Sequence, residues 1–255
     1  MEKLKISAIP ENLHSPFPLI NSVINLLQDG NIYSEGDTFF IFHKSGFSYL
    51  IAKDNVDYSA ILKFLLQSKE LPGYFHIYEA PPGLVAECSS NPENVKIKLR
   101  KRIQLKFADS QLIPGNILPS DYALERIDFS SLEKLAEFKL SLENRFWRSE
   151  SDFLTNGFGF TVDNEFGSPV SICYSACVSD NVAEIDVTTL PEYRGRGLAK
   201  LAVSRFVSHC LENGIIANWD CFEDNYMSLR TAESIGFKHM FSYDFLSIFN
   251  KKRNS

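Results

Sequence analysis

Residues 193–202 read YRGRGLAKLA, with two glycines and two arginines at the start of an amphipathic pattern. From Leu198 onward, apolar residues recur every three or four positions, which predicts a helix that ends at Gly214. A strand-like stretch, residues 182–189, precedes it. A glycine-containing turn between strand and helix is either a plain surface turn or an anion cradle, because the first N–H groups of a helix lack intrahelical partners.

The residues of this turn suit a phosphate group. Gly195 and Gly197 let the backbone approach a ligand closely because they carry no Cβ, and Arg194 and Arg196 supply donors for phosphate oxygens. The stretch has neither the GxxxxGK[ST] pattern of a P-loop nor the third glycine of the dinucleotide fingerprint. The turn is therefore neither of these two phosphate motifs, and the two glycines taken alone are more typical of a plain turn.

The elements around the turn predict a mixed sheet. Working outward, we expect strands at 122–128, 157–164, 168–179, 182–189, 215–221 and 238–249, and helices at 131–142, 149–156, 198–213 and 225–235. The order β-α-α-β-β-β-α-β-α-β is typical of a sheet with helices packed on it.

A break in the periodic pattern predicts two domains. Residues 108–122 contain Pro114, Gly115, Asn116 and Pro119, so we place a boundary near residue 118. The predicted domains are 1–118, a smaller α/β domain, and 119–255. In the first we expect helices near 17–28 and 57–68, a hairpin at 37–53, and strands at 73–80 and 96–107.

The strand predicted at 96–107 has a basic stripe. Lysine and arginine alternate with apolar residues, which gives one wet face and one buried face. The stripe either contacts an anion or protects a solvated edge strand, and the alternation favours the edge strand.

Composition indicates a soluble cytoplasmic protein. The chain of 255 residues is 44% hydrophobic, has no apolar run of about 20 residues, and lacks a signal peptide at its start. No CxxC pair occurs among Cys88, Cys173, Cys177, Cys210 and Cys221, so we expect a reducing compartment and no structural zinc. The five histidines lack metal-ligand spacing, so no metal is predicted.

The charge distribution points to a cationic partner. The net charge is -6, and residues 121–255 hold the whole excess, with 14 Lys/Arg against 20 Asp/Glu. An acidic field repels nucleic acid and attracts a cation such as an amine. Alternatively, the acidic residues only keep the surface soluble.

At this point the sequence resembles a known family. The run RGRGLA at 194–199 is similar to the R/Q-x-x-G-x-G/A pyrophosphate loop of the GNAT superfamily of N-acetyltransferases, and 187–193, VTTLPEY, resembles the strand end and turn before that loop. Asn225 and Ser228, followed by Gly236 and Phe237, resemble the family's N-x-x-S/A helix that ends in G-F. The resemblance spans about residues 120–250, and the chain is also similar to a subgroup with zwittermicin A resistance acetyltransferases.

This resemblance implies an α+β fold and acetyl-CoA, or another acyl-CoA, as donor. It implies transfer of an acetyl group to an amine of a small molecule or protein by direct attack on the thioester. The implied donor-binding residues are Val187, Thr188, Thr189, Arg194, Gly195, Arg196, Gly197, Leu198, Ala199, Asn225 and Ser228. Asn225 alternatively only caps its helix, and Ser228 only packs.

Two carboxylates are candidates for the catalytic base. Glu184 and Asp186 lie two residues apart on one strand and project from the same face, so either can remove a proton from the acceptor amine. Alternatively, both recognise a cationic acceptor or face water. The loop at 145–148, with Trp147, either shapes acceptor specificity or packs beneath a loop.

One departure from the family pattern keeps a second class of function open. Many members have a tyrosine, acting as an acid toward the thiolate, four residues before the glycine of G-F, whereas this chain has Ala232. The alternative is a non-catalytic module that binds CoA or a protein partner. The N-terminal half is open to a third interpretation, a degenerate copy of the same fold without a phosphate loop.

Overall fold

The computed structural model describes residues 1–52, 56–107, 118–138 and 145–253, and of residues 136–138 only the backbone. The fold is mixed α/β, with a mainly antiparallel sheet flanked by helices, as predicted. The chain forms two compact units. Unit 1 comprises Met1–Arg102 and Ser242–Ser255, and unit 2 comprises Ile103–Phe241. No helix within the described ranges is long and apolar enough to cross a membrane.

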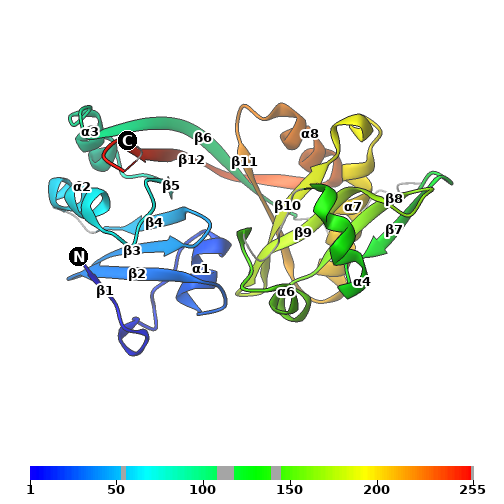
Figure 1. Ribbon diagram of the computed structural model, residues 1–255, viewed down its shortest axis with the longest axis horizontal. Helices are drawn as coiled ribbons and strands as arrows, with labels where there is room; N and C mark the ends of the chain where they lie inside the picture. The colour runs from blue at the N-terminus through cyan, green and yellow to red at the C-terminus, as the bar shows by residue number, and fades with distance from the viewer. Residues whose placement is uncertain (53–55, 108–117, 139–144, 254–255) are drawn as a thin grey trace. The chain divides into compact units, whose positions relative to one another are not determined.

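Unit 2 contains the elements predicted around the glycine turn (Figure 1). They are β7 (Tyr122–Arg126), α4 (Phe129–Leu132), η2 (Glu133–Phe138), α6 (Glu150–Asn156), β8 (Gly159–Asn164), β9 (Pro169–Ser179), β10 (Val182–Thr189), η3 (Pro191–Tyr193), α7 (Leu198–Glu212), β11 (Ile216–Phe222) and α8 (Tyr226–Ile235). The predicted order of strands and helices is confirmed. The end of the helix predicted at 131–142 lies outside the described residues.

One helix covers most of this sheet. Strands β7, β8, β9 and β10 pair antiparallel in sequence, and β11 pairs parallel to β10. The apolar stripe of α7 places Ala202, Phe206 and Val207 in a core with Phe160 and Ala183 of the sheet. The helical period thus fixes which face of β10 is buried, and this decides where its polar side chains point.

Unit 1 has a similar mixture of elements. They are β1 (Glu2–Lys3), η1 (Ile6–Ala8), α1 (Pro18–Ile24), β2 (Gly30–Glu35), β3 (Thr38–His43), β4 (Phe47–Ile51), α2 (Tyr58–Gln67), β5 (Tyr74–Tyr78) and α3 (Pro82–Ser89). The strands β1 to β4 pair antiparallel, and β4 pairs parallel with β5. The core lies between this sheet and helices α2 and α3.

Each unit takes one strand segment from the other half of the sequence. β6 (Val95–Phe107) begins in unit 1, but Ile103 and Leu105 are buried in the core of unit 2. β12 (Phe237–Asn250) begins in unit 2, and its end pairs antiparallel with β5 and buries Leu246 in the core of unit 1. Neither core is therefore complete with one half of the chain alone.

This arrangement corrects the expectation for residues 96–107. β6 lies between β12 and β11 in the strand order, so it is not an edge strand. Leu99, expected on a buried face, is 43% exposed. The basic residues therefore do not protect a free edge, because both edges of the strand are paired.

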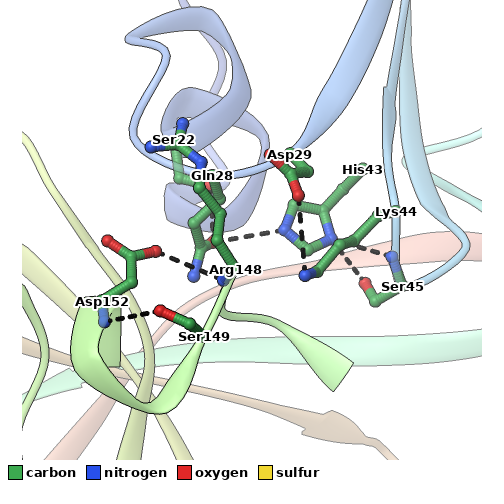
Figure 2. Close-up of polar contacts among 9 residues, drawn as sticks. All are labelled: Ser22, Gln28, Asp29, His43, Lys44, Ser45, Arg148, Ser149 and Asp152. Carbon is green, nitrogen blue, oxygen red and sulfur yellow. Dashed lines mark hydrogen bonds and ion pairs between the residues drawn. The ribbon is translucent and has the colours of Figure 1, made fainter. Parts of the chain in front are cut away.

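Unit 1 also contains a buried histidine in a polar network (Figure 2). His43 is fully buried on β3, and its Nδ1 accepts a hydrogen bond from the backbone N–H of Ser45 at 3.1 Å. Its Nε2 lies 3.2 Å from Oε1 of Gln28, which also accepts from the Ser22 hydroxyl. An amide oxygen only accepts, so the contacts fit a neutral ring protonated at Nε2. Burial, followed by the charge of Lys44, lowers the pKa of His43 to about 3.

We predict that this histidine makes stability depend on pH. In the unfolded chain the ring has its ordinary pKa of 6.5, whereas in the folded protein it becomes protonated only near pH 3. Stability is therefore present above pH 6.5 and falls as the pH drops from 6.5 toward 3, by a loss on the order of 4 kcal/mol. Urea unfolding across this range measures it. His43→Gln should reduce the change of the unfolding free energy with pH. The control is His239→Gln, which replaces an exposed histidine and should leave this pH dependence as in the parent protein. An unchanged pH dependence in His43→Gln would contradict the prediction.

Candidate active site

The site begins where two parallel strands part. β10 and β11 pair only from Val182 to Glu184, against Ile216 to Asn218, although β10 continues to Thr189. At the same level the register with β9 shifts between Glu184 and Ile185, and a bulge increases local twist. Beyond Glu184, the structure pairs the described residues of β10 with β9 alone. The other edge of β10 is therefore open to an extended ligand that adds as a strand.

The glycine turn follows this open edge. Gly195 and Gly197 have φ angles of 78° and 79°, in the left-handed region that favours glycine. Apart from each glycine and its chain neighbours, no heavy atom of the described residues lies within 4 Å of the position that a Cβ would occupy, so the space beside both is open. Conformation, and not crowding, therefore explains why both positions are glycine.

The start of α7 has no cap of its own. Gly197 is the N-cap residue and has no side chain to accept from the helix. In the described part of the chain, no group accepts a hydrogen bond from the backbone N–H groups of residues 195–200. Unpaired N–H groups and the helix dipole together attract an anion, so the turn has the physical properties of the predicted cradle.

The open edge and the cradle border one cavity of about 580 Å³. It is lined by Val187, Thr188, Thr189, Tyr193, Arg194, Gly195, Gly197, Leu198, Ala199, Lys200, Trp219, Asn225, Met227, Ser228, Arg230, Thr231 and Ser234. The structure thus gathers every predicted donor-binding residue except Arg196 around one space.

The two arginines of the turn differ. Arg194 lines the cavity, and its Nε donates to the carbonyl of Thr189 at 3.1 Å. Arg196 instead donates to the Tyr122 hydroxyl and to the Glu192 carbonyl, and its guanidinium lies 5.0 Å from the centre of the Tyr193 ring. The side chain of Arg196 therefore holds the turn in place, and only its backbone N–H belongs to the cradle.

Sequence reasoning missed several lining residues. Lys200 lies in the first turn of α7, three residues after Gly197, and Arg230 lies on α8. Helical spacing from the turn and from Asn225 would have found both. The two cations increase the positive potential of the cavity.

Helix α8 forms the opposite wall. The Asn225 side chain caps it by accepting from the Ser228 backbone N–H at 3.3 Å. The indole N–H of Trp219 donates to the Ser228 hydroxyl oxygen at 3.1 Å. Ala232 is fully buried in the core of unit 2. Position 232 therefore offers no hydroxyl to the cavity, and the hydroxyl of Ser228 lies one helical turn earlier on the same wall.

The two candidate carboxylates lie beside the parting strands. Glu184 and Asp186 are half-buried and alternate with the buried Ala183 and Ile185, so they project from the sheet face opposite the core, as predicted. Neither lines the cavity. Glu184 accepts at Oε2 from the side-chain amide of the fully buried Asn218, at 2.5 Å. The last paired residue of β11 therefore fixes one oxygen of Glu184.

Asp186 is more heavily engaged. Its Oδ2 accepts from the Tyr174 hydroxyl at 2.6 Å and lies 2.8 Å from Nη1 of Arg145. Burial, followed by the charge of Asp186, raises the pKa of Tyr174 well above its usual value, so the phenol stays protonated and donates. The Tyr174 hydroxyl and the Arg145 guanidinium therefore hold the carboxylate of Asp186 in a fixed position.

Residues 145–148 contain one side chain that packs in the core and one that contacts a candidate carboxylate. Trp147 is buried, donates its indole N–H to the Ser175 carbonyl, and packs edge-on against Phe153. Arg145, two residues earlier, is half-exposed and reaches Asp186. The described residues contain no group of three or more His, Cys, Asp or Glu side chains placed to hold a metal ion.

Comparisons with known proteins agree with this architecture. The model of the GNAT acetyltransferase family matches residues 86–246, and this chain belongs to that family. It is 40% identical over 126 residues to the uncharacterized N-acetyltransferase YdfB of Bacillus subtilis (strain 168). That match covers 49% of this chain and 48% of YdfB, so the chain spans about half the length of this curated relative.

Solved structures share the fold. A GCN5-related N-acetyltransferase-like protein from Streptococcus suis 89/1591 superposes with a TM-score of 0.70 and 21% identity, over 91% of this chain and 92% of that one. A putative GNAT acetyltransferase from Novosphingobium aromaticivorans DSM 12444 has a TM-score of 0.61 and 18% identity, over 92% and 97%. A tandem GNAT protein from the clavulanic acid biosynthesis pathway has a TM-score of 0.58 and 12% identity, over 87% and 83%.

We predict that Gly197→Ala destabilises the turn. At a φ of 79° the Cβ of an alanine lies too close to the backbone carbonyl oxygen, so the free energy of unfolding should fall by roughly 1–2 kcal/mol. Equilibrium urea unfolding measures this loss. Lys200→Ala in the adjoining helical turn is the control and should change stability by less than about 0.5 kcal/mol. Equal stability of Gly197→Ala and the parent protein would show that the turn does not need glycine.

Proposed function

We propose that the protein is an N-acetyltransferase that transfers an acetyl group from acetyl-CoA to an amine. One observation carries the proposal: the open edge of β10 and the uncapped start of α7 border the same cavity. Acetyl-CoA has a pyrophosphate followed by an extended arm that ends in a thioester. A cradle for an anion beside an open strand edge suits those two parts in that order.

The residues that would hold the donor follow from this fit. Backbone N–H groups of Arg194 through Ala199 bind the pyrophosphate, and the backbone of Val187 through Thr189 pairs with the arm. Asn225 and Ser228 contact the arm from α8. Lys200 and Arg230 add positive charge for the phosphates.

Glu184 is the preferred base in this reaction. The thioester of acetyl-CoA supplies the acetyl group, and the acceptor amine must lose a proton as it attacks. Glu184 accepts that proton directly or through a water, and the hydrogen bond of 2.5 Å from Asn218 to Oε2 fixes the position of its carboxylate. Asp186, held by Tyr174 and Arg145, orients the acceptor side of the site. The alternative role for both carboxylates is recognition of a cationic acceptor.

The acceptor is an amine of a small molecule or a protein, and the acidic excess of residues 121–255 supports a cationic one. We include no metal, nucleic acid or membrane in the proposal. The described cysteines are all buried and form no disulfide, which supports work in the reducing cytoplasm.

We also propose that the N-terminal half, residues 1–118, is a diverged copy of the fold of residues 119–255. The run β3-β4-α2-β5-α3-β6 repeats the order β9-β10-α7-β11-α8-β12, with one parallel pair in each. At the start of α2, however, the Asp57 carboxylate accepts from the N–H groups of Ser59 and Ala60. A built-in anion therefore takes the place that a phosphate would need.

The first test is binding. Calorimetry should find one CoA per chain, because the start of α7 has no capping side chain whereas Asp57 caps the corresponding helix α2. Gly197→Trp, which fills the open space of the cradle, should abolish binding. Gly167→Trp is the matched control: Gly167 also has a positive φ and open space, and it lies in the turn between β8 and β9. Absence of CoA binding by the parent protein would sink the proposal.

The second test concerns the base. Glu184→Gln keeps the size and the contact with Asn218 but cannot accept a proton, so kcat should fall by about 10²-fold or more with CoA affinity unchanged. Asp186→Asn should cost less. Initial rates of thiol release with a panel of amines measure both. A fully active Glu184→Gln would exclude Glu184 as the base.

The alternative function is a CoA-binding module without turnover. Ala232, buried and without a hydroxyl, favours it. Binding of CoA with no thiol release across the amine panel would support the module and contradict the transferase.

A further inference from the structure

The hydroxyl of Ser228 is oriented by an unusual partner. Ser228 lies in the first turn of α8, is half-buried, and lines the cavity. Its oxygen accepts from the Trp219 indole N–H at 3.1 Å. An indole N–H only donates, so the serine must direct its own hydrogen elsewhere. Among the described residues, none accepts that hydrogen.

Two other hydroxyls of α8 line the same cavity, and their hydrogens are engaged. Thr231 donates to the carbonyl of Met227 at 2.8 Å, and Ser234 donates to the carbonyl of Thr231 at 2.9 Å. Backbone acceptors within the helix satisfy both. Of the hydroxyls that this helix presents to the cavity, Ser228 is the one whose donor is left for a ligand.

We propose that Ser228 is a catalytic residue, which donates a hydrogen bond to the sulfur of the departing CoA thiolate. This inference rests on the proposed function. Ser228 and Trp219 lie on the walls of the cavity that also includes the open edge of β10, where the arm of the donor is placed. Accepting from the indole polarises the serine O–H and strengthens it as a donor.

The chemistry requires a hydrogen-bond donor at the sulfur and no acid. As the amine attacks, an N–C bond forms and the C–S bond breaks, and the electron pair of that bond stays on sulfur. The amine proton goes to Glu184. A serine hydroxyl is far less acidic than a thiol of pKa about 8.5, so Ser228 keeps its proton and the thiolate is protonated by solvent. Buried Ala232 is then no obstacle to turnover.

The test is the pKa of the CoA thiol when CoA is bound, followed by ultraviolet absorbance of the thiolate. A hydrogen bond to a charged acceptor is stronger than one to a neutral acceptor, so Ser228 should lower this pKa. Ser228→Ala should raise it by about 1 unit. The same variant should lower kcat about tenfold and change the KM for acetyl-CoA by a smaller factor.

Four of the protein's five thiols leave the measurement clear. Burial raises the pKa of Cys88 and of Cys210 to about 12, and it raises those of Cys173 and Cys177 well above the usual value. A titration of each variant without CoA gives the background to subtract.

Three variants separate the role of Ser228 from general packing. Ser234→Ala removes a hydroxyl from the same helix and cavity wall, but one already engaged, so the pKa of bound CoA should stay unchanged. Ser228→Thr keeps a hydroxyl and should restore the low pKa. Trp219→Phe removes the indole donor and should raise the pKa by less than Ser228→Ala does.

The outcomes are distinct. If CoA binds and its thiol pKa is the same in Ser228→Ala and the parent protein, this inference is overturned while the proposed function stands. If Ser228→Ala fails to bind CoA, Ser228→Thr decides: a thiol pKa equal to that of free CoA overturns the inference. If the parent protein binds no CoA, the proposed function fails, and this inference fails with it.

Discussion

The parting of β10 from β11 is the constraint on which the rest of the site depends. Pairing stops at Glu184 and Asn218, at the level where the register with β9 shifts. A bulge twists one side of β10 away, and the buried indole of Trp219 follows directly on the other strand. An open strand edge inside a sheet is costly unless something pairs with it. The same stretch of β10 therefore borders the cavity and offers the strand edge that the proposed donor would pair with.

The two halves of the chain differ in how the start of one helix is capped. Both place a helix after one strand of a parallel pair, yet Asp57 neutralises the start of α2 while Gly197 leaves the start of α7 bare. A carboxylate that accepts two N–H groups competes with any phosphate for the same donors. We infer that a single cap residue, more than the fold itself, separates a donor-binding half from a structural one.

Sequence patterns predicted what depends on neighbouring residues. The element order of 119–255 and the glycine turn follow from local periodicity and φ preference, and both are confirmed. Local patterns could not predict that β6 and β12 each contribute to both units, because strand partners distant in sequence decide it. The edge-strand expectation for 96–107 was wrong for that reason. The contacts of Arg145 and Tyr174 with Asp186 are equally non-local. The donor-binding and catalytic roles stay predictions.

The faces of β10 separate the two substrates of the proposed reaction. Helices α7 and α8 line the cavity, and α7 packs with Ala183 and Ile185, whereas Glu184 and Asp186 project from the opposite face. A donor held in the cavity and an amine held by the carboxylates therefore approach from different sides. The donor and the amine can meet only where no paired strands lie between them. Among the described residues, β10 and β11 stop pairing after Glu184, so the two substrates would meet beyond that residue. In the proposed reaction, the gap that accepts the donor is thus also the passage through which the acetyl group reaches the amine.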